Sequence, residues 1–189
     1  MARQFITRNT QVAAVSETRN DNLDRYLTLV VGDEIFGLSI LTVREIDEYC
    51  ELTPIPMMPE FIRGALNLRG QVVPVIDLAQ RLGREQTVTK KRTCIVIVEL
   101  TRSGEAYMEV GLMVDAVSQV INIAPDDIKP APSFGGALHT DFIHGVGKND
   151  EQFVILLNID RVLSLDDVAL LDQARELGGD DGGNAEVAG

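Results

Sequence analysis

Short apolar runs, separated by turn residues, occupy the chain from about residue 25 to about residue 163 and predict a mainly β protein. Phe36, Leu38 and Ile40 alternate with small or polar residues, which is the period-two pattern of a half-buried strand. Gly32-Asp33 lies between two such runs and predicts a hairpin from residue 25 to residue 40. The same criteria predict further strands over residues 43–49, 71–76, 93–100, 109–123 and 153–158.

Proline and capping residues predict a few short helices and one irregular strand. Pro59 suits the first turn of a helix and predicts one over residues 60–66. Asp77 follows a predicted strand and is expected to cap a short helix that ends at Gly83. Pro74 indicates that its strand lies at a sheet edge or carries a bulge. The pattern also predicts helices over residues 159–163 and 166–177.

Both ends of the chain are polar. Residues 1–24 show no apolar periodicity, and residues 175–189 are rich in Gly and Asp. Such segments bury too little apolar surface to offset the entropy of ordering them. We therefore expect a flexible N-terminal arm over 1–24, one ordered domain over 25–174, and a flexible acidic tail over 175–189.

Two blocks of sequence recur in the same order. The stretch that begins at Gly37 resembles the stretch that begins at Gly111, 74 residues later, and Phe61-Ile-Arg-Gly64 resembles Phe142-Ile-His-Gly145, 81 residues later. Two copies of a short-strand unit predict two small β-barrels packed together, because closing a barrel removes exposed sheet edges.

Composition narrows the possible functions. The formal net charge is −12, which disfavours nucleic acid and anionic lipid, since both bind through Lys and Arg. Cys50 and Cys94 are isolated, and the two histidines, His139 and His144, have no nearby ligand cluster, so we expect no disulfide, no metal and no cofactor. With no signal peptide and no apolar run near 20 residues, the sequence predicts a soluble cytoplasmic protein.

Arg69 raises a question of role. It lies in Gly64-Ala-Leu-Asn-Leu-Arg-Gly70, but the second copy has Asp150 at the corresponding position. Because the fold can be built without this arginine, a recognition role is favoured over a plain turn role.

Taken together, several stretches resemble the CheW family, the coupling adaptors of bacterial chemotaxis. The matching stretches are GDEIFGLSILTVREI, TPIPMMP, IRGALNLRGQVVPVIDL, GLMVDAVSQV, IKPAP and LLNIDRVL. The resemblance runs from about residue 26 to about residue 171. Ala79-Gln80 departs from the basic residue that many members carry after Asp-Leu.

The resemblance implies two intertwined, SH3-like, five-stranded barrels without enzymatic activity. The implied partners are the cytoplasmic helical hairpin of a chemoreceptor, the regulatory domain of the histidine kinase CheA, and other adaptor copies in array rings at the inner face of the membrane. The implied receptor-facing residues are Val43, Glu45, Ile46, Asn67, Leu68, Arg69, Gly70 and Ile95. Phe134 has two open roles, as a barrel cap or as a contact to a kinase domain or adaptor.

Other interpretations remain open from the sequence. Glu45 has two possible roles, to contact the partner or to pair with Arg69. Asp77 ends an apolar strand, as a phospho-acceptor aspartate would, although the strand–helix alternation of a receiver domain is missing. A scaffold of a chemosensory pathway that does not serve motility is the remaining alternative. Neither histidine has a persuasive signature for catalysis.

Overall fold

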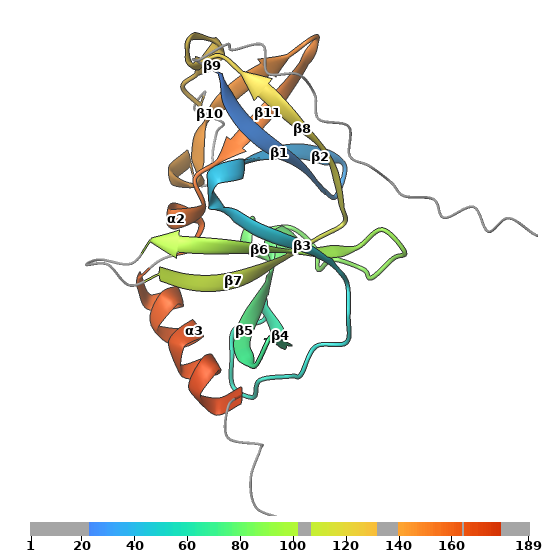
Figure 1. Cartoon of the computed structure of the whole chain (residues 1–189), viewed down its shortest axis with the longest axis vertical. Helices are drawn as coiled ribbons and strands as arrows, with labels where there is room; N and C mark the ends of the chain where they lie inside the picture. The colour runs from blue at the N-terminus through green and yellow to red at the C-terminus, as the bar shows by residue number, and fades with distance from the viewer. Residues whose placement is uncertain (1–22, 102–106, 132–139, 164, 179–189) are drawn as a thin grey trace, which may run out of the picture.

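The computed structural model describes residues 23–101, 107–131, 140–163 and 165–178. Two sheets dominate it (Figure 1). The upper sheet has the order β8 (Ala116–Ile123), β1 (Asp24–Val31), β2 (Glu34–Ser39), β11 (Gln152–Leu157), β10 (Ile143–Asn149) and β9 (Ile128–Lys129). The lower sheet has the order β3 (Val43–Glu48), β6 (Cys94–Thr101), β7 (Tyr107–Val114), β5 (Gln71–Asp77) and β4 (Ile62–Leu68).

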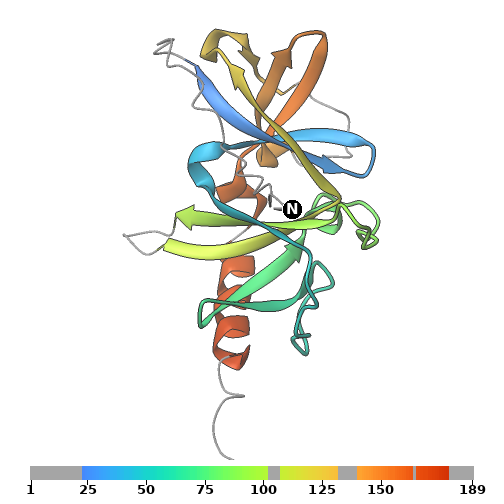
Figure 2. The same ribbon diagram turned by 45° about the vertical axis from the view of Figure 1, so that its right-hand side comes forward.

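Three short 3-10 helices and three α-helices complete the described chain. They are η1 (Ile40–Thr42), η2 (Pro125–Asp127), η3 (Thr140–Phe142), α1 (Leu78–Arg81), α2 (Ile159–Val162) and α3 (Leu165–Gly178). The helix α3 runs down beside the lower sheet, with the two sheets stacked above one another (Figures 1 and 2). It extends to Gly178, so residues 175–178, which the sequence assigned to the tail, are helical.

The two sheets exchange their first hairpins. The β1–β2 hairpin, from the first copy of the repeat, joins strands β8–β11 of the second copy, and the β6–β7 hairpin joins β3–β5 of the first. Each joint is a parallel pairing, in which Leu156 lies opposite Gly37 and Val75 lies opposite Gly111. These pairs match at the 74- and 81-residue spacings of the sequence repeat. The structure therefore confirms both the duplication and the intertwined arrangement.

The glycines shared by the two copies have a common structural reason. A Cβ on Gly64 would lie 2.5 Å from the backbone oxygen of Thr53, and a Cβ on Gly145 would lie 2.8 Å from that of Lys129. In the lower sheet this close approach is an isolated bridge between Thr53 and Ala65. In the upper sheet it has grown into the short strand β9. Hence the upper sheet has six strands where five were expected, and in both sheets the described strands form an open ladder rather than a closed barrel.

The helix expected over residues 60–66 is wrong, because these residues enter strand β4. The equivalent strand of the second copy, β10, was not predicted either. Glycines lowered the strand signal in both segments, and only pairing with distant strands makes these segments extended. Pro74 also differs from expectation, since β5 lies between β7 and β4. The backbone of Ala65, opposite Pro74, bonds to Thr53, so the proline nitrogen faces β7 just before that pairing begins at Val75.

Three hydrophobic clusters stabilise this architecture. The largest lies between the sheets and draws on both copies, including Leu29, Phe36, Val98 and Leu112. Each sheet also encloses a smaller inner cluster, around Ile95, Ile97 and Met113 in the lower sheet and around Tyr26, Ile123 and Leu156 in the upper one. The large shared cluster makes the two units fold as one body.

Arg81, at the end of α1, ties the two copies together. Its Nε donates to the carbonyl oxygen of Val162, its counterpart 81 residues later, at 2.7 Å. Its guanidinium lies 5.2 Å from the ring centre of Phe61 and 5.0 Å from that of Phe142, which are themselves counterparts. It also pairs with Asp167 of α3 at 2.8 Å. The pseudo-symmetric junction is therefore held by one polar side chain from a single copy.

Candidate partner-binding site

The β4–β5 turn presents Arg69 to solvent. Arg69 and Gly70 have φ angles of 52° and 85°, the positive values required by a two-residue type I′ turn. The Oδ1 atom of Asn67 accepts a hydrogen bond from the Gly70 amide at 2.8 Å, which fixes the turn. In the second copy Asp150 takes the corresponding positive φ of 53°. The fold thus requires the backbone angle at this position and not the arginine.

Arg69 spans the mouth of the lower sheet to reach β3. Its Nη2 lies 2.5 Å from Oε2 of Glu45, with 77% of the arginine side chain and 24% of the glutamate side chain exposed. A pair this exposed contributes on the order of 0–1 kcal/mol to stability. Of the two roles left open for Glu45, pairing with Arg69 is therefore present in the structure, and its effect is to position the guanidinium.

Strand β3 divides its predicted contact residues between two faces. Glu45 lies opposite Ile97 of the inner cluster, while Ile46 lies opposite Val96 of the shared cluster, and directly opposed residues point to the same face. Ile46 is 44% exposed. Val43 begins the strand and is half-buried against the shared cluster. The surface is therefore a rim that runs over both sides of one edge strand.

Ile95 must be removed from the predicted contact surface. Its side chain is fully buried, at 0% exposure, in the inner cluster of the lower sheet. It pairs with Asp47 on β3 and Met113 on β7, so β6 is an interior strand covered on both flanks. The aliphatic pattern of residues 94–98 fits core and contact roles equally, and only the strand order separates them.

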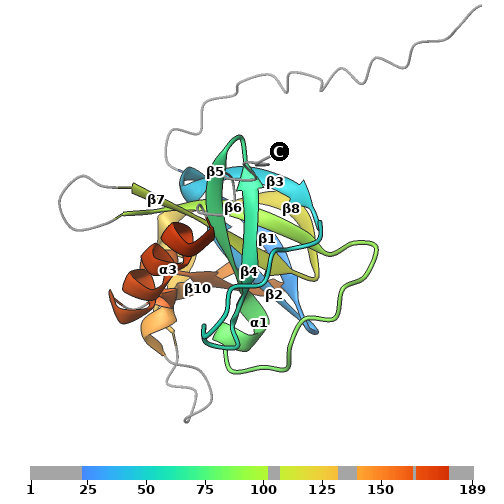
Figure 3. The same ribbon diagram turned by 90° about the horizontal axis from the view of Figure 1, so that it is seen from below.

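A cleft of about 550 Å³ opens between the two edges of the lower sheet. We call it the β3–β4 cleft. Its walls are the end of β3, the connection after it, and β4, and its described lining includes Asp47, Glu48 and Glu51 but no Lys, Arg or His. The Thr53–Ala65 bridge also lines it, and Figure 3 shows the connection crossing beneath the sheet. Sequence analysis missed this cleft, because it arises where two edge strands fail to close.

Asp77 has the structural role that its capping pattern predicted. It is completely buried and accepts hydrogen bonds from the amides of Ala79 and Gln80, at 3.0 and 3.3 Å, at the start of α1. Thr87 donates to it twice, through its amide and its hydroxyl, both at 2.8 Å. Arg63 pairs with it at 3.0 Å. A carboxylate so fully engaged has no oxygen free to accept a phosphoryl group.

The remaining predicted position, Phe134, lies outside the described residues, as do residues 1–22 and 179–189. The structure adds one surface residue that the sequence did not single out, Val120. It is the counterpart of Ile46, 74 residues later, and is 49% exposed on the edge strand β8. Within the described residues, no group of three or more His, Cys, Asp or Glu side chains could hold a metal ion. No helix in this part of the chain has the length and apolarity to cross a membrane.

A sheet pair with exchanged hairpins, carrying a turn arginine tied to an edge strand, is the geometry to compare with known proteins. Residues 25–167 match the model of the CheW-like domain. The chain belongs to this family. It is 34% identical to the chemotaxis protein CheW of Klebsiella aerogenes over 85% of this chain and 95% of that protein. It is also 33% identical to protein FrzA of Myxococcus xanthus over 70% of this chain and 81% of that protein.

A solved structure agrees with the fold. The crystal structure of the scaffolding protein TtCheW from Thermoanaerobacter tengcongensis superposes with a TM-score of 0.69 and 32% identity, over 80% of this chain and 95% of that one. These matches confirm the predicted family, the predominantly β fold, and the prediction that a CheW-like chain is a scaffold rather than an enzyme.

Proposed function

We propose that this CheW-like chain is a chemotaxis adaptor that joins the cytoplasmic helical hairpin of a chemoreceptor to the regulatory domain of the histidine kinase CheA. The same proposal extends to contacts with further copies of the adaptor in receptor arrays on the inner face of the membrane. Family membership supports an adaptor of this kind, and the residues that would meet the receptor are proposed from the geometry of β3 and the β4–β5 turn.

Arg69 is the observation that carries the proposal. A residue with a side chain at positive φ costs roughly 1–2 kcal/mol relative to the right-handed helical region, and Asn or Asp tolerates this conformation better than arginine. The exposed pair with Glu45 returns too little to offset that cost. A strained, solvent-facing arginine whose counterpart is Asp150 is therefore best explained by recognition.

The surroundings of Arg69 suit an α-helical partner. A docked helix needs an apolar strip with a few polar anchors. Ile46 and Leu68 supply half-exposed apolar area, and the planar guanidinium of Arg69 matches a carboxylate or a helix-terminal carbonyl. Asn67 and Gly70 shape the turn that places the guanidinium.

The test separates recognition from folding. Arg69→Asn keeps a residue that tolerates positive φ, so we expect the variant to be as stable as the parent or slightly more stable. Binding to a soluble receptor-tip fragment should weaken about 10-fold or more, as for loss of a charged interface contact. Arg69→Ala should bind equally poorly and lose up to about 1 kcal/mol of stability through backbone strain. Unchanged receptor affinity in both variants, measured by calorimetry, would refute the role of Arg69.

The phospho-acceptor alternative is disfavoured by the burial and five bonds of Asp77, and labelling with acetyl phosphate provides its direct test. Incorporation of phosphate at Asp77 in the folded protein would revive that alternative.

A further inference from the structure

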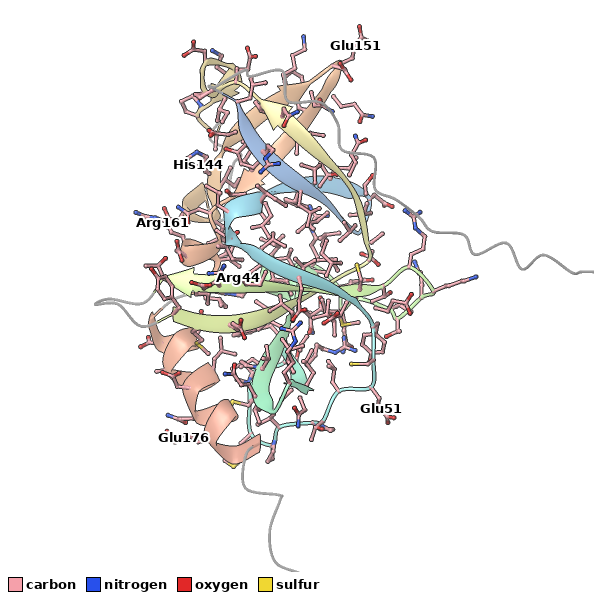
Figure 4. All side chains as sticks on the ribbon, viewed as in Figure 1. Arg44, Glu51, His144, Glu151, Arg161 and Glu176 are labelled. Atoms are coloured by element: carbon pink, nitrogen blue, oxygen red, sulfur yellow. The ribbon has the colours of Figure 1, made fainter. Side chains whose placement is uncertain are left out.

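The β3–β4 cleft sits beside the proposed receptor surface and differs from it in charge. Glu45 is neutralised by Arg69 at the turn. Further along β3 and its connection, Asp47, Glu48 and Glu51 line the cleft, and none of the three forms an ion pair within the described part of the chain. Figure 4 shows Glu51 at the connection, directed away from the fold. One end of the surface is therefore a cation held on a carboxylate, and the other is a set of uncompensated carboxylates.

The floor of the cleft is apolar. Leu66 and Leu68 of β4 line it, and both belong to or pack against the inner cluster. An apolar floor beneath a ring of carboxylates fits a Lys or Arg side chain, which buries its aliphatic stem along apolar surface while its charged head stays at the rim. The cleft is also too large for one side chain alone, at about 550 Å³, so a flank of the partner helix must enter with it.

We infer that the β3–β4 cleft receives a basic flank of the receptor helix, one or more Lys or Arg side chains, while Arg69 engages an acidic residue further along the same helix. This inference rests on the proposed receptor-binding function and adds the polarity of the partner. The two opposite charges fix the direction in which the helix lies across β3, because the reversed orientation would place like charges together.

Two neighbouring glutamates provide the main test. Glu48→Lys with Glu51→Lys reverses two exposed carboxylates of the cleft and leaves Arg69 intact. The control, Asp126→Lys with Asp127→Lys, makes the same change of net charge at exposed positions of η2 on the other sheet. Circular dichroism first establishes that both variants are folded.

Affinity for a soluble receptor-tip fragment is then measured by calorimetry with the full chain. We expect the cleft variant to bind about 10-fold or more weakly and the control to bind within about 2-fold of the parent. Raising the salt concentration should weaken the parent more than the cleft variant. Reversal of one basic residue on the receptor fragment should restore binding to the cleft variant.

Cys50 gives an independent readout, because it lines the cleft and is exposed while Cys94 is buried. Bound receptor fragment should slow alkylation of Cys50 by N-ethylmaleimide. Equal affinity of the cleft variant and the control, or no protection of Cys50 by a fragment that binds, would overturn the inference and leave the adaptor function standing. If the parent chain does not bind the fragment at all, the adaptor function fails and this inference fails with it.

Discussion

Replacing Asp77 by alanine is the most informative test of the fold, because the repeat supplies a matched control. The equivalent residue of the second copy is Asn158, which also precedes a short helix but makes no side-chain capping bond. Asp77→Ala removes a buried carboxylate that accepts two cap bonds and two bonds from Thr87, and that pairs with Arg63. Asn158→Ala removes a side chain from the same place in the fold without those interactions.

The magnitude follows from what the substitution leaves behind. Loss of a helix cap costs about 1 kcal/mol. Breaking a buried ion pair by removing one partner costs about 3–5 kcal/mol, and the lower end applies because the Arg63 side chain is 18% exposed and regains some hydration. The amide and hydroxyl of Thr87 lose their acceptor as well. We therefore expect Asp77→Ala to lower the free energy of unfolding by about 4 kcal/mol, and Asn158→Ala by less than about 1 kcal/mol.

Urea denaturation followed by far-ultraviolet circular dichroism measures both values, since the chain has no tryptophan. The slope of the transition should stay unchanged, so that the shift in midpoint reports stability. A difference of less than about 1 kcal/mol between the two variants would show that the Asp77 network contributes little. An Asp77→Ala chain of parental stability that has lost signalling would point instead to a functional aspartate.

Three further predictions concern other parts of the fold. Gly64→Ala should cost at least about 2 kcal/mol, because its Cβ would meet the Thr53 carbonyl at a φ of 146°, whereas Gly70→Ala, at a φ of 85° in open space, should cost only about 1 kcal/mol in the same urea assay; equal costs would contradict this. Arg81→Met should lower stability by about 2 kcal/mol through loss of its charged hydrogen bonds, with unfolding still a single transition in calorimetry, and two separate transitions would mean that Arg81 alone couples the units. Burial raises the pKa of the Cys94 thiol above its usual 9.0, opposed by the amide of Val117 and by Arg92. Its stabilising contribution should be complete below about pH 9 and be lost above it, since the unfolded thiol ionises first; a urea midpoint that rises from pH 8 to pH 10.5 would refute the sign.

The candidate site shows where sequence reasoning worked and where it stopped. That Arg69 is dispensable for the fold follows from comparing the two copies, and the structure agrees, because Asp150 adopts the same backbone conformation. The contact role of Ile95 could not be judged in this way. An aliphatic residue on a strand reads the same whether the strand is interior or exposed, and Ile95 turned out to be enclosed while Ile46 is not.

The sequence by itself determined the local features: alternating strands, the cap at Asp77, the internal repeat and the family. These depend on side-chain periodicity and on hydrogen bonds between near neighbours, which are written in a few consecutive residues. Tertiary structure alone decided that β4 and β10 are strands, that the hairpins are exchanged, and that β3 and β4 leave a cleft between them. Those outcomes depend on which distant backbones approach closely enough to pair, as at Gly64 and Thr53, and that proximity is set only when the whole chain has packed.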